Sequence, residues 1–126
     1  MDEKFFTEYF ENYARAYDDF NAEALAQYYS APTLMVNNGS VVGLSTPEQI
    51  LEHLNGQLAS DREQGYKHSH LAGLEMHKDG AWGMTVTVHW MIDRADGSRL
   101  RDIFSTYNLL KQASQWRILV TTDHPA

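Results

Sequence analysis

Residues 82–93 read WGMTVTVHWMID and have the clearest periodicity in the chain. Large apolar side chains occupy every second position from Trp82 to Ile92, and most of the residues between them are small or polar. A period of two residues is typical of a β-strand, because successive side chains of a strand point to opposite faces of the sheet. The stretch therefore predicts a long strand with one buried face.

Three more segments, 66–77, 99–111 and 116–124, are rich in β-branched and aromatic residues and predict further long strands. Asp79-Gly80 and Asp96-Gly97 predict tight hairpin turns between them, and residues 112–115 predict a looser turn. The second half of the chain is therefore expected to form an antiparallel sheet of four long strands.

The turn at Lys78-Asp79-Gly80 allows two strand registers, which differ in the face that the preceding strand turns toward the core. A bulge in this turn puts Met76, Leu74 and His70 on the face of Trp90, whereas a strict two-residue turn puts them on the opposite face. The apolar side chains of Met76 and Leu74 favour the bulge. Across the next turn, the same face is expected to receive Ile103, Ser105, Tyr107 and Leu109. The opposite face is expected to carry Thr85, Thr87, His89, Met91, Phe104, Thr106 and Leu110.

The first half of the chain predicts helices and a short strand pair. Apolar residues recur every three or four positions over 3–19, which indicates an amphipathic helix. Asn21 is expected to cap a short helix over 22–29 that Pro32 ends, and strands are expected at 33–36 and 41–42 around Asn38-Gly39. Thr46-Pro47-Glu48-Gln49 has the pattern of a capped helix start, followed by an apolar stripe of Ile50, Leu51, Leu54 and Leu58.

Helices followed by long hairpins predict an α+β fold with the helices on one face of the sheet. Four long strands are expected to twist and curl around the first and third helices. The result is a curved antiparallel sheet that forms a conical pocket, and the mouth of such a pocket is a common ligand site.

Length, charge and composition exclude several classes of protein. The 126 residues are enough for a single domain, over 1–126, with a substantial core. A net charge of -7 without a basic cluster argues against nucleic acid and against an anionic membrane surface as partners. The absence of cysteine excludes disulfides and thiolate chemistry. No signal segment or apolar span is evident, so we expect a soluble, cytoplasmic protein.

The order of elements resembles the NTF2-like (SnoaL-like) superfamily with its cystatin-like fold. The resemblance rests on the helix-kink-helix opening at residues 16–29, the capped helix after Gly43, and a closing hairpin with Trp116-Arg117-Ile118. It implies the conical α+β barrel, a ligand pocket and homodimers that associate through the sheet. The superfamily includes isomerases, dehydratases, cyclases, hydrolases and non-catalytic binding or assembly domains, so the resemblance implies no single function.

Two branches of the superfamily suggest particular site residues. Ketosteroid isomerase-like members need a carboxylate on the first short strand, where this chain has Met35, Val36 and two asparagines, so that reaction is not expected although Tyr13 matches the helix tyrosine. The scytalone dehydratase branch has a Tyr-Asp pair at the end of the first helix and a strand histidine, which Tyr17, Asp18 and His70 match. A further pocket tyrosine of that branch matches a position near Asn38 of this chain. Its second pocket histidine matches a position near His89 or Met91.

Physical chemistry independently suggests a dyad of Asp18 and His70. A carboxylate bonded to one ring nitrogen would leave the other nitrogen ready for acid/base work, and Tyr17 could polarise a carbonyl group. The alternative is that Asp18 caps the helix kink and His70 is a polar edge residue. The residues expected to bind the substrate are Tyr13, Trp90, Tyr107 and Ser105, although an aromatic stripe of this kind also suits a plain core.

No cofactor and no metal ion are expected. His68 and His70 share a strand face, but a zinc site needs a third ligand and His89 is the obvious strand neighbour. Three functions therefore remain open. They are a cofactor-free lyase or isomerase acting on a small, apolar carbonyl substrate, a non-catalytic binder of a small hydrophobic molecule, and a dimerisation module with a vestigial cavity.

Overall fold

A computed structural model describes residues 3–125, which form three helices and one six-stranded sheet. The sheet order is β2-β1-β6-β5-β4-β3, with all neighbours antiparallel except β1 and β6. In chain order the elements are α1 (Glu3–Asp18), α2 (Ala22–Ala26), β1 (Tyr29–Asn37), β2 (Ser40–Leu44), α3 (Pro47–Glu63), β3 (Tyr66–Asp79), β4 (Gly83–Arg94), β5 (Arg99–Gln112) and β6 (Gln115–Pro125).

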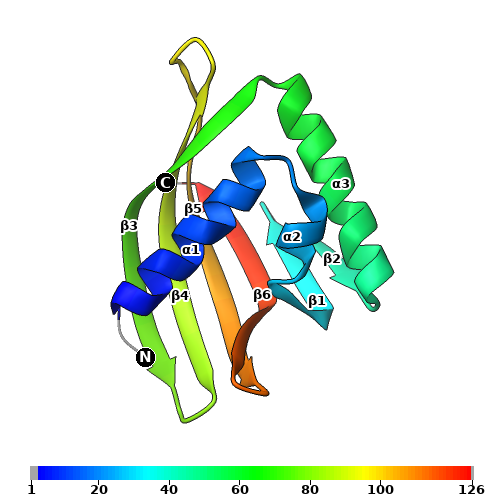
Figure 1. The fold of residues 1–126 in the computed structure, drawn as a ribbon, viewed down its shortest axis with the longest axis vertical. Coiled ribbons are helices and arrows are strands. Elements are labelled where there is room, and N and C mark those ends of the chain that lie inside the picture. Colours follow the sequence, from blue (N-terminus) through cyan, green and yellow to red (C-terminus); the bar gives the residue numbers. More distant parts are fainter. Residues whose placement is uncertain (1–2, 126) are drawn as a thin grey trace.

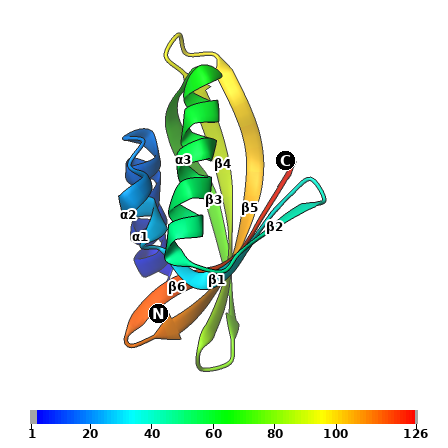
Figure 2. The ribbon, with the colours of Figure 1, turned by 90° about the vertical axis from the view of Figure 1, so that its right-hand side faces the viewer.

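The sheet is strongly curved, and the helices gather on its concave side (Figure 1). In the side view, α1 and α3 run alongside the long strands while the β1–β2 hairpin projects away from them (Figure 2). This arrangement confirms the predicted α+β fold with a curled sheet around α1 and α3. Among the described residues, no helix combines the length and the apolar character needed to cross a bilayer.

The helices form where the sequence predicts them, because their apolar stripes meet the concave face of the sheet. Phe6 and Phe10 of α1 are fully buried, and α3 buries Ile50 and Leu54. The cap of α3 also forms as expected, since the Thr46 hydroxyl accepts a hydrogen bond of 3.2 Å from the backbone N–H of Gln49.

Three local predictions are wrong. The short helix ends at Ala26, so Pro32 lies inside β1 and is not its terminator. Trp82 lies in a three-residue turn between paired Asp79 and Gly83, and it is 66% exposed. The turn after β5 is tighter than expected, because Ala113 and Ser114 both adopt positive φ values (49° and 68°) between paired Gln112 and Gln115.

The outer face of the sheet carries a row of stacked rings. The rings of His89 and Phe104 lie 4.6 Å apart and those of Phe104 and His124 lie 5.8 Å apart, so the row crosses β4, β5 and β6. Thr87 and Thr106 form the neighbouring pair, joined at 3.0 Å through their hydroxyls. The predicted composition of this face is therefore confirmed. The homodimer expected to form on it stays a prediction, which the molecular mass in solution would test.

Candidate functional site

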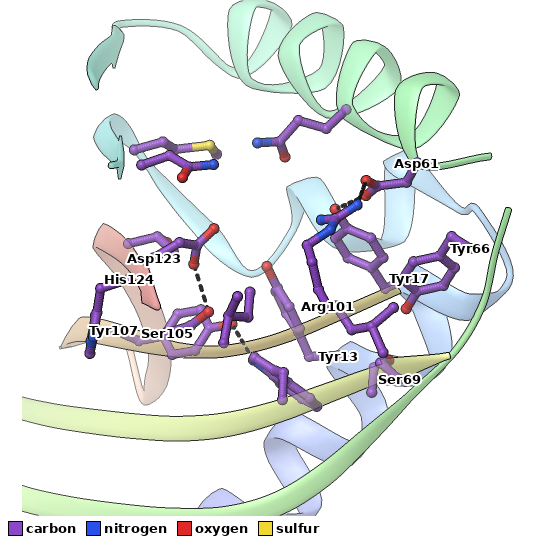
Figure 3. A pocket seen from close by; sticks show the side chains of 18 of the residues that line it. Tyr13, Tyr17, Asp61, Tyr66, Ser69, Arg101, Ser105, Tyr107, Asp123 and His124 are labelled. Atoms are coloured by element: carbon purple, nitrogen blue, oxygen red, sulfur yellow. Dashed lines mark hydrogen bonds and ion pairs between the residues drawn. The ribbon is translucent and has the colours of Figure 1, made fainter. Parts of the chain in front are cut away.

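A cavity of about 490 Å³ lies between α1, α3 and the concave face of the sheet. Its walls come from segments far apart in the sequence, and side chains from the helices and from five of the strands project into it (Figure 3). Tyr13 and Tyr17 of α1 line one side, and Trp90, Ile103 and other inward-facing strand residues line the opposite side. The curvature of the sheet therefore produces the predicted pocket.

The apolar wall of the cavity consists of aromatic rings with satisfied polar tips. Tyr13 stacks on Trp90 with ring centres 6.5 Å apart, and its hydroxyl lies 2.6 Å from that of Tyr29. The indole N–H of Trp90 donates to the Tyr107 hydroxyl at 3.0 Å. Burial raises the pKa of Tyr13 and Tyr107 well above the ordinary tyrosine value and that of Tyr29 to about 12, so all three phenols stay neutral near pH 7.

One end of the cavity contains an ion pair held by a tyrosine. Asp61, near the C-terminal end of α3, pairs with the Arg101 guanidinium through its Oδ1. Its Oδ2 accepts a hydrogen bond of 2.8 Å from the Tyr17 hydroxyl. The side chain of Asp61 is only 7% exposed, so water has little access to its half of the ion pair.

A second carboxyl group, that of Asp123 on β6, lines another part of the cavity (Figure 3). The Ser105 hydroxyl donates to its Oδ1 at 2.6 Å. Burial raises the pKa of Asp123, although the hydrogen bond from Ser105 and the positive charge of Arg101 both oppose this shift. A carboxyl group with a raised pKa beside a cavity can exchange a proton with a bound molecule more readily than an ordinary aspartate.

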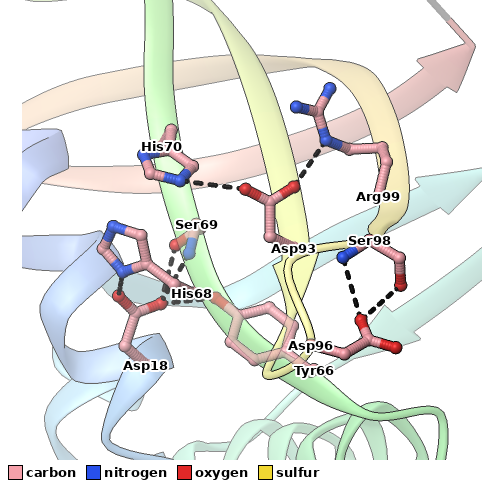
Figure 4. Close-up of polar contacts among 9 residues, drawn as sticks. All are labelled: Asp18, Tyr66, His68, Ser69, His70, Asp93, Asp96, Ser98 and Arg99. Atoms are coloured by element: carbon pink, nitrogen blue, oxygen red, sulfur yellow. Dashed lines mark hydrogen bonds and ion pairs between the residues drawn. The ribbon is translucent and has the colours of Figure 1, made fainter.

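The predicted dyad of Asp18 and His70 does not form. Asp18 accepts hydrogen bonds from the Tyr66 hydroxyl at 2.7 Å and from Ser69, and His68 Nδ1 lies 2.6 Å from its other oxygen (Figure 4). His70 instead places Nε2 3.1 Å from Asp93, with half of its side chain exposed. Neither Asp18 nor His70 lines the cavity.

A bulge in β3 explains why His70 faces outward. Leu74 and Met76 pair with Val88 and Val86 on the core face, as predicted. Leu71 pairs with Trp90 and Gly73 with His89, so Ala72 is an extra residue in β3. An extra residue reverses the alternation of the strand, which sends His70 to the outer face opposite Met91.

The structure brings together the predicted substrate-binding residues Tyr13, Trp90, Tyr107 and Ser105, all of which line the cavity. Tyr17 lines it too, but its hydroxyl already donates to Asp61 and is not free to polarise a ligand carbonyl as predicted. His89 and Met91, the alternatives for a second pocket histidine, both lie outside the lining. Among residues 3–125, no group of three His, Asp or Glu side chains is arranged to hold a metal ion.

The sequence match agrees with this fold and covers nearly the whole chain. Residues 2–126 match the family described as NTF2-like protein (DUF6841). The chain belongs to this family. Among curated proteins, none matches the sequence of this NTF2-like protein.

Solved structures with the same fold have very different sequences. An NTF2-like protein with a cystatin-like fold from Novosphingobium aromaticivorans is 16% identical, with a TM-score of 0.74 over 92% of this chain and 76% of its own. Aln2 from a Streptomyces species is 13% identical, with a TM-score of 0.76 over 99% and 93%. The yeast UBP3-associated protein BRE5 is 16% identical, with a TM-score of 0.75 over 94% and 91%. At these identities the likeness establishes the NTF2-like, cystatin-like fold alone, and it does not single out the scytalone dehydratase branch.

Sequence reasoning missed Asp61, Arg101 and Asp123 of this NTF2-like protein. Asp61 lies three residues after Leu58 and so continues the buried stripe of α3, where a carboxylate is unexpected. Arg101 lies two residues before Ile103 and so extends an inward-facing series. Both signals were present in the sequence, as charged residues on faces that are otherwise buried.

Proposed function

We propose that this NTF2-like protein binds a small, mainly apolar molecule inside the cavity between α1, α3 and the sheet. The observation that carries this proposal is the cavity itself, whose volume of about 490 Å³ is typical of small-molecule sites. A few polar groups converge on an aromatic wall, which is the usual composition of such sites.

The alternative of a dimerisation module predicts a cavity filled by the protein's own side chains. Here the aromatic rings pack against one another, as Phe10 does on Tyr107 at 4.5 Å, and still leave the space beside Tyr13 and Trp90 open. Maintaining an open cavity forgoes packing contacts that would stabilise the core. The open space therefore favours ligand binding over a purely structural role.

A substitution that fills the cavity tests the proposal. Ile103 lines the cavity, and its neighbour Phe104 points to the outer face of the sheet. We expect Ile103→Trp to weaken binding of the neutral fluorophore N-phenyl-1-naphthylamine by at least about tenfold, because the indole occupies the ligand's volume. Fluorescence titration measures this.

Phe104→Trp is the matched control, since it adds the same side chain one residue away on the opposite face. It is expected to bind the fluorophore as the unmodified protein does. Equal binding by both variants, or no saturable binding by the unmodified protein, would contradict the proposed pocket.

A second candidate function is proton transfer on the bound molecule, and the environment of Asp123 favours it. Its carboxyl group lines the cavity and its pKa is raised by burial, so Asp123 replaces His70 as the candidate general acid or base. Ser105 donates to Oδ1 and holds the group in place. This arrangement suits a cofactor-free isomerisation or elimination, in which Asp123 exchanges a proton with a small carbonyl substrate.

The raised pKa of Asp123 predicts how stability depends on pH. A carboxyl group with a raised pKa in the folded state stabilises the fold most below its unfolded pKa, near 3.8, and this contribution is lost as the pH rises through the folded pKa. Asp123→Asn is therefore expected to be more stable than the unmodified protein at pH 7, by about 1.4 kcal/mol for each unit by which the pKa is raised.

Urea denaturation between pH 4 and pH 8 measures this difference. The two unfolding free energies are expected to approach each other toward pH 4, because the folded-state carboxyl group of Asp123 becomes protonated as the pH falls toward its unfolded pKa near 3.8. The contrary result is a variant that is less stable than the unmodified protein by the same amount at every pH. It would show that burial does not destabilise the ionised carboxyl group of Asp123.

A further inference from the structure

Arg101 is the only Arg or Lys among the described residues that line the cavity. Its side chain comes from near the start of β5, on the concave face of the sheet, and extends into the open space between α3 and the sheet (Figure 3). Its side chain is 32% exposed and lines the cavity. A molecule bound at this end of the cavity therefore meets a positively charged donor.

The guanidinium has hydrogen-bond donors to spare. Arginine carries five N–H donors in a fixed fork, and the side-chain hydrogen bond of Arg101 to Asp61 uses only Nη2. Within residues 3–125, Nε and Nη1 have no protein acceptor. Two corners of the fork are therefore available to an oxygen atom of a ligand.

Asp61 and Tyr17 hold this fork in one orientation. Asp61 Oδ1 accepts a hydrogen bond from Arg101, and Asp61 Oδ2 accepts one from the Tyr17 hydroxyl. The carboxylate therefore joins α1, α3 and β5. A buried ion pair is seldom more stabilising than apolar residues of the same size. The free N–H donors that Arg101 presents to the cavity therefore explain the ion pair better than a gain in stability does.

The charges around Arg101 favour a neutral acceptor over an anion. Asp61 already balances the positive charge, and Asp123 adds a second carboxyl group to the same lining. A ligand carboxylate would face both acidic groups, whereas a carbonyl oxygen can accept from the guanidinium without adding negative charge.

We infer that Arg101 is the specificity-determining residue of the pocket, that it selects ligands with a neutral carbonyl oxygen, and that Asp61 and Tyr17 are positioning residues for its guanidinium. The inference rests on the proposed binding function. It adds the chemical class of the ligand and its direction, with the carbonyl group toward α3 and the apolar body along Tyr13 and Trp90.

Three ligands of one shape test this inference. They are 2-acetylnaphthalene, its hydrocarbon isostere 2-isopropenylnaphthalene, and the anion 2-naphthoate. Binding is followed by NMR at the indole N–H of Trp90, which lines the cavity, while Trp82 and Trp116 lie outside the lining and serve as internal references. The quantity measured is the ratio of the ketone's affinity to that of the hydrocarbon.

The main variant is Asp61→Asn/Arg101→Met, which removes both charges together so that neither is left unpaired, and which leaves no hydrogen-bond donor at position 101. Arg101→Lys retains the ion pair and the fold but lacks the planar fork. Arg99→Gln is the matched control, because Arg99 lies on the same strand and pairs with Asp93 away from the cavity.

In the unmodified protein and in Arg99→Gln, the ketone is expected to bind about tenfold more tightly than the hydrocarbon. The ratio is expected to fall to about one in the double variant and to drop at least about threefold in Arg101→Lys. This ratio is insensitive to a general loss of stability, because both ligands need the same folded pocket.

The other outcomes separate the two proposals. Equal binding of ketone and hydrocarbon at Trp90 overturns the role of Arg101 and leaves the pocket in place. A ratio that persists in both Arg101 variants overturns it as well, as does preferential binding of 2-naphthoate, which would make the ligand an anion. Failure of all three ligands to bind overturns the proposed function together with the inference.

Discussion

Asp18→Ala is expected to lower the free energy of unfolding by about 3 kcal/mol, because Asp18 joins the end of α1 to the first residues of β3. Its carboxylate accepts from the Tyr66 hydroxyl, from the backbone N–H of Ser69 and from the Ser69 hydroxyl, at 2.7, 3.0 and 2.8 Å. Removing it leaves three donors without their acceptor in a region that is mostly shielded, since the carboxylate is 16% exposed.

The position of Asp18 at the C-terminal end of α1 supports this structural role. A negative charge at the C-terminal end of a helix is unfavourable with respect to the helix dipole, so its contacts to β3 must outweigh that effect. Thermal and urea denaturation measure the loss, which corresponds to a midpoint lower by on the order of 10 °C for a chain of this length.

Asp19→Ala is the matched control for Asp18→Ala. Asp19 is the next residue, and its backbone N–H donates to the Arg15 carbonyl, a bond that the substitution leaves in place. The control is expected to stay within about 0.5 kcal/mol of the unmodified protein. If both variants lost the same stability, the effect would belong to the kink in the chain and not to the carboxylate.

Arg101→Met is expected to destabilise the protein by about 2 to 3 kcal/mol. The substitution leaves the Asp61 carboxylate almost fully buried with no cation beside it, which is the costly way to break an ion pair. The loss is smaller than for a fully buried pair, because Arg101 is 32% exposed and Tyr17 still donates to Asp61.

The double variant Asp61→Leu/Arg101→Met separates the pair's own contribution from the cost of an unpaired charge. It is expected to recover most of the lost stability, since apolar residues of similar volume often replace a buried ion pair without loss. Urea denaturation of the four proteins of this cycle gives the coupling between the two residues. A double variant as unstable as the sum of the single variants would show that the two side chains act independently.

Much of the site could be predicted from the alternation of the strands. Trp90, Ser105 and Tyr107 were placed on the inner face by a period of two residues carried across one hairpin, and they line the cavity. The stripe of α1 placed Tyr13 there in the same way. These predictions succeed because a regular strand or helix repeats its direction as long as its hydrogen bonding is uninterrupted.

The place of Asp123 in the site depended on a feature that the sequence does not reveal. In the hairpin of β5 and β6, Leu109 pairs with Ile118 but Asn108 pairs with Val120, so Leu119 is an extra residue. The register after this bulge places Asp123 opposite Ser105 on the inner face, where an uninterrupted ladder would have placed Thr122. The Leu119 carbonyl finds its partner in the Thr33 hydroxyl at 2.7 Å, a contact 86 residues away in the chain.

The α+β class, the curved sheet, the capped helix and the aromatic wall of this NTF2-like protein therefore follow from its residue pattern. That Asp123 enters the cavity and His70 does not was settled by the tertiary structure alone. The reason is that two single-residue bulges, at Ala72 and at Leu119, turned His70 outward and Asp123 inward. A shift of one residue exchanges the two faces of every strand position beyond it, so the alternation of apolar residues alone does not place those positions.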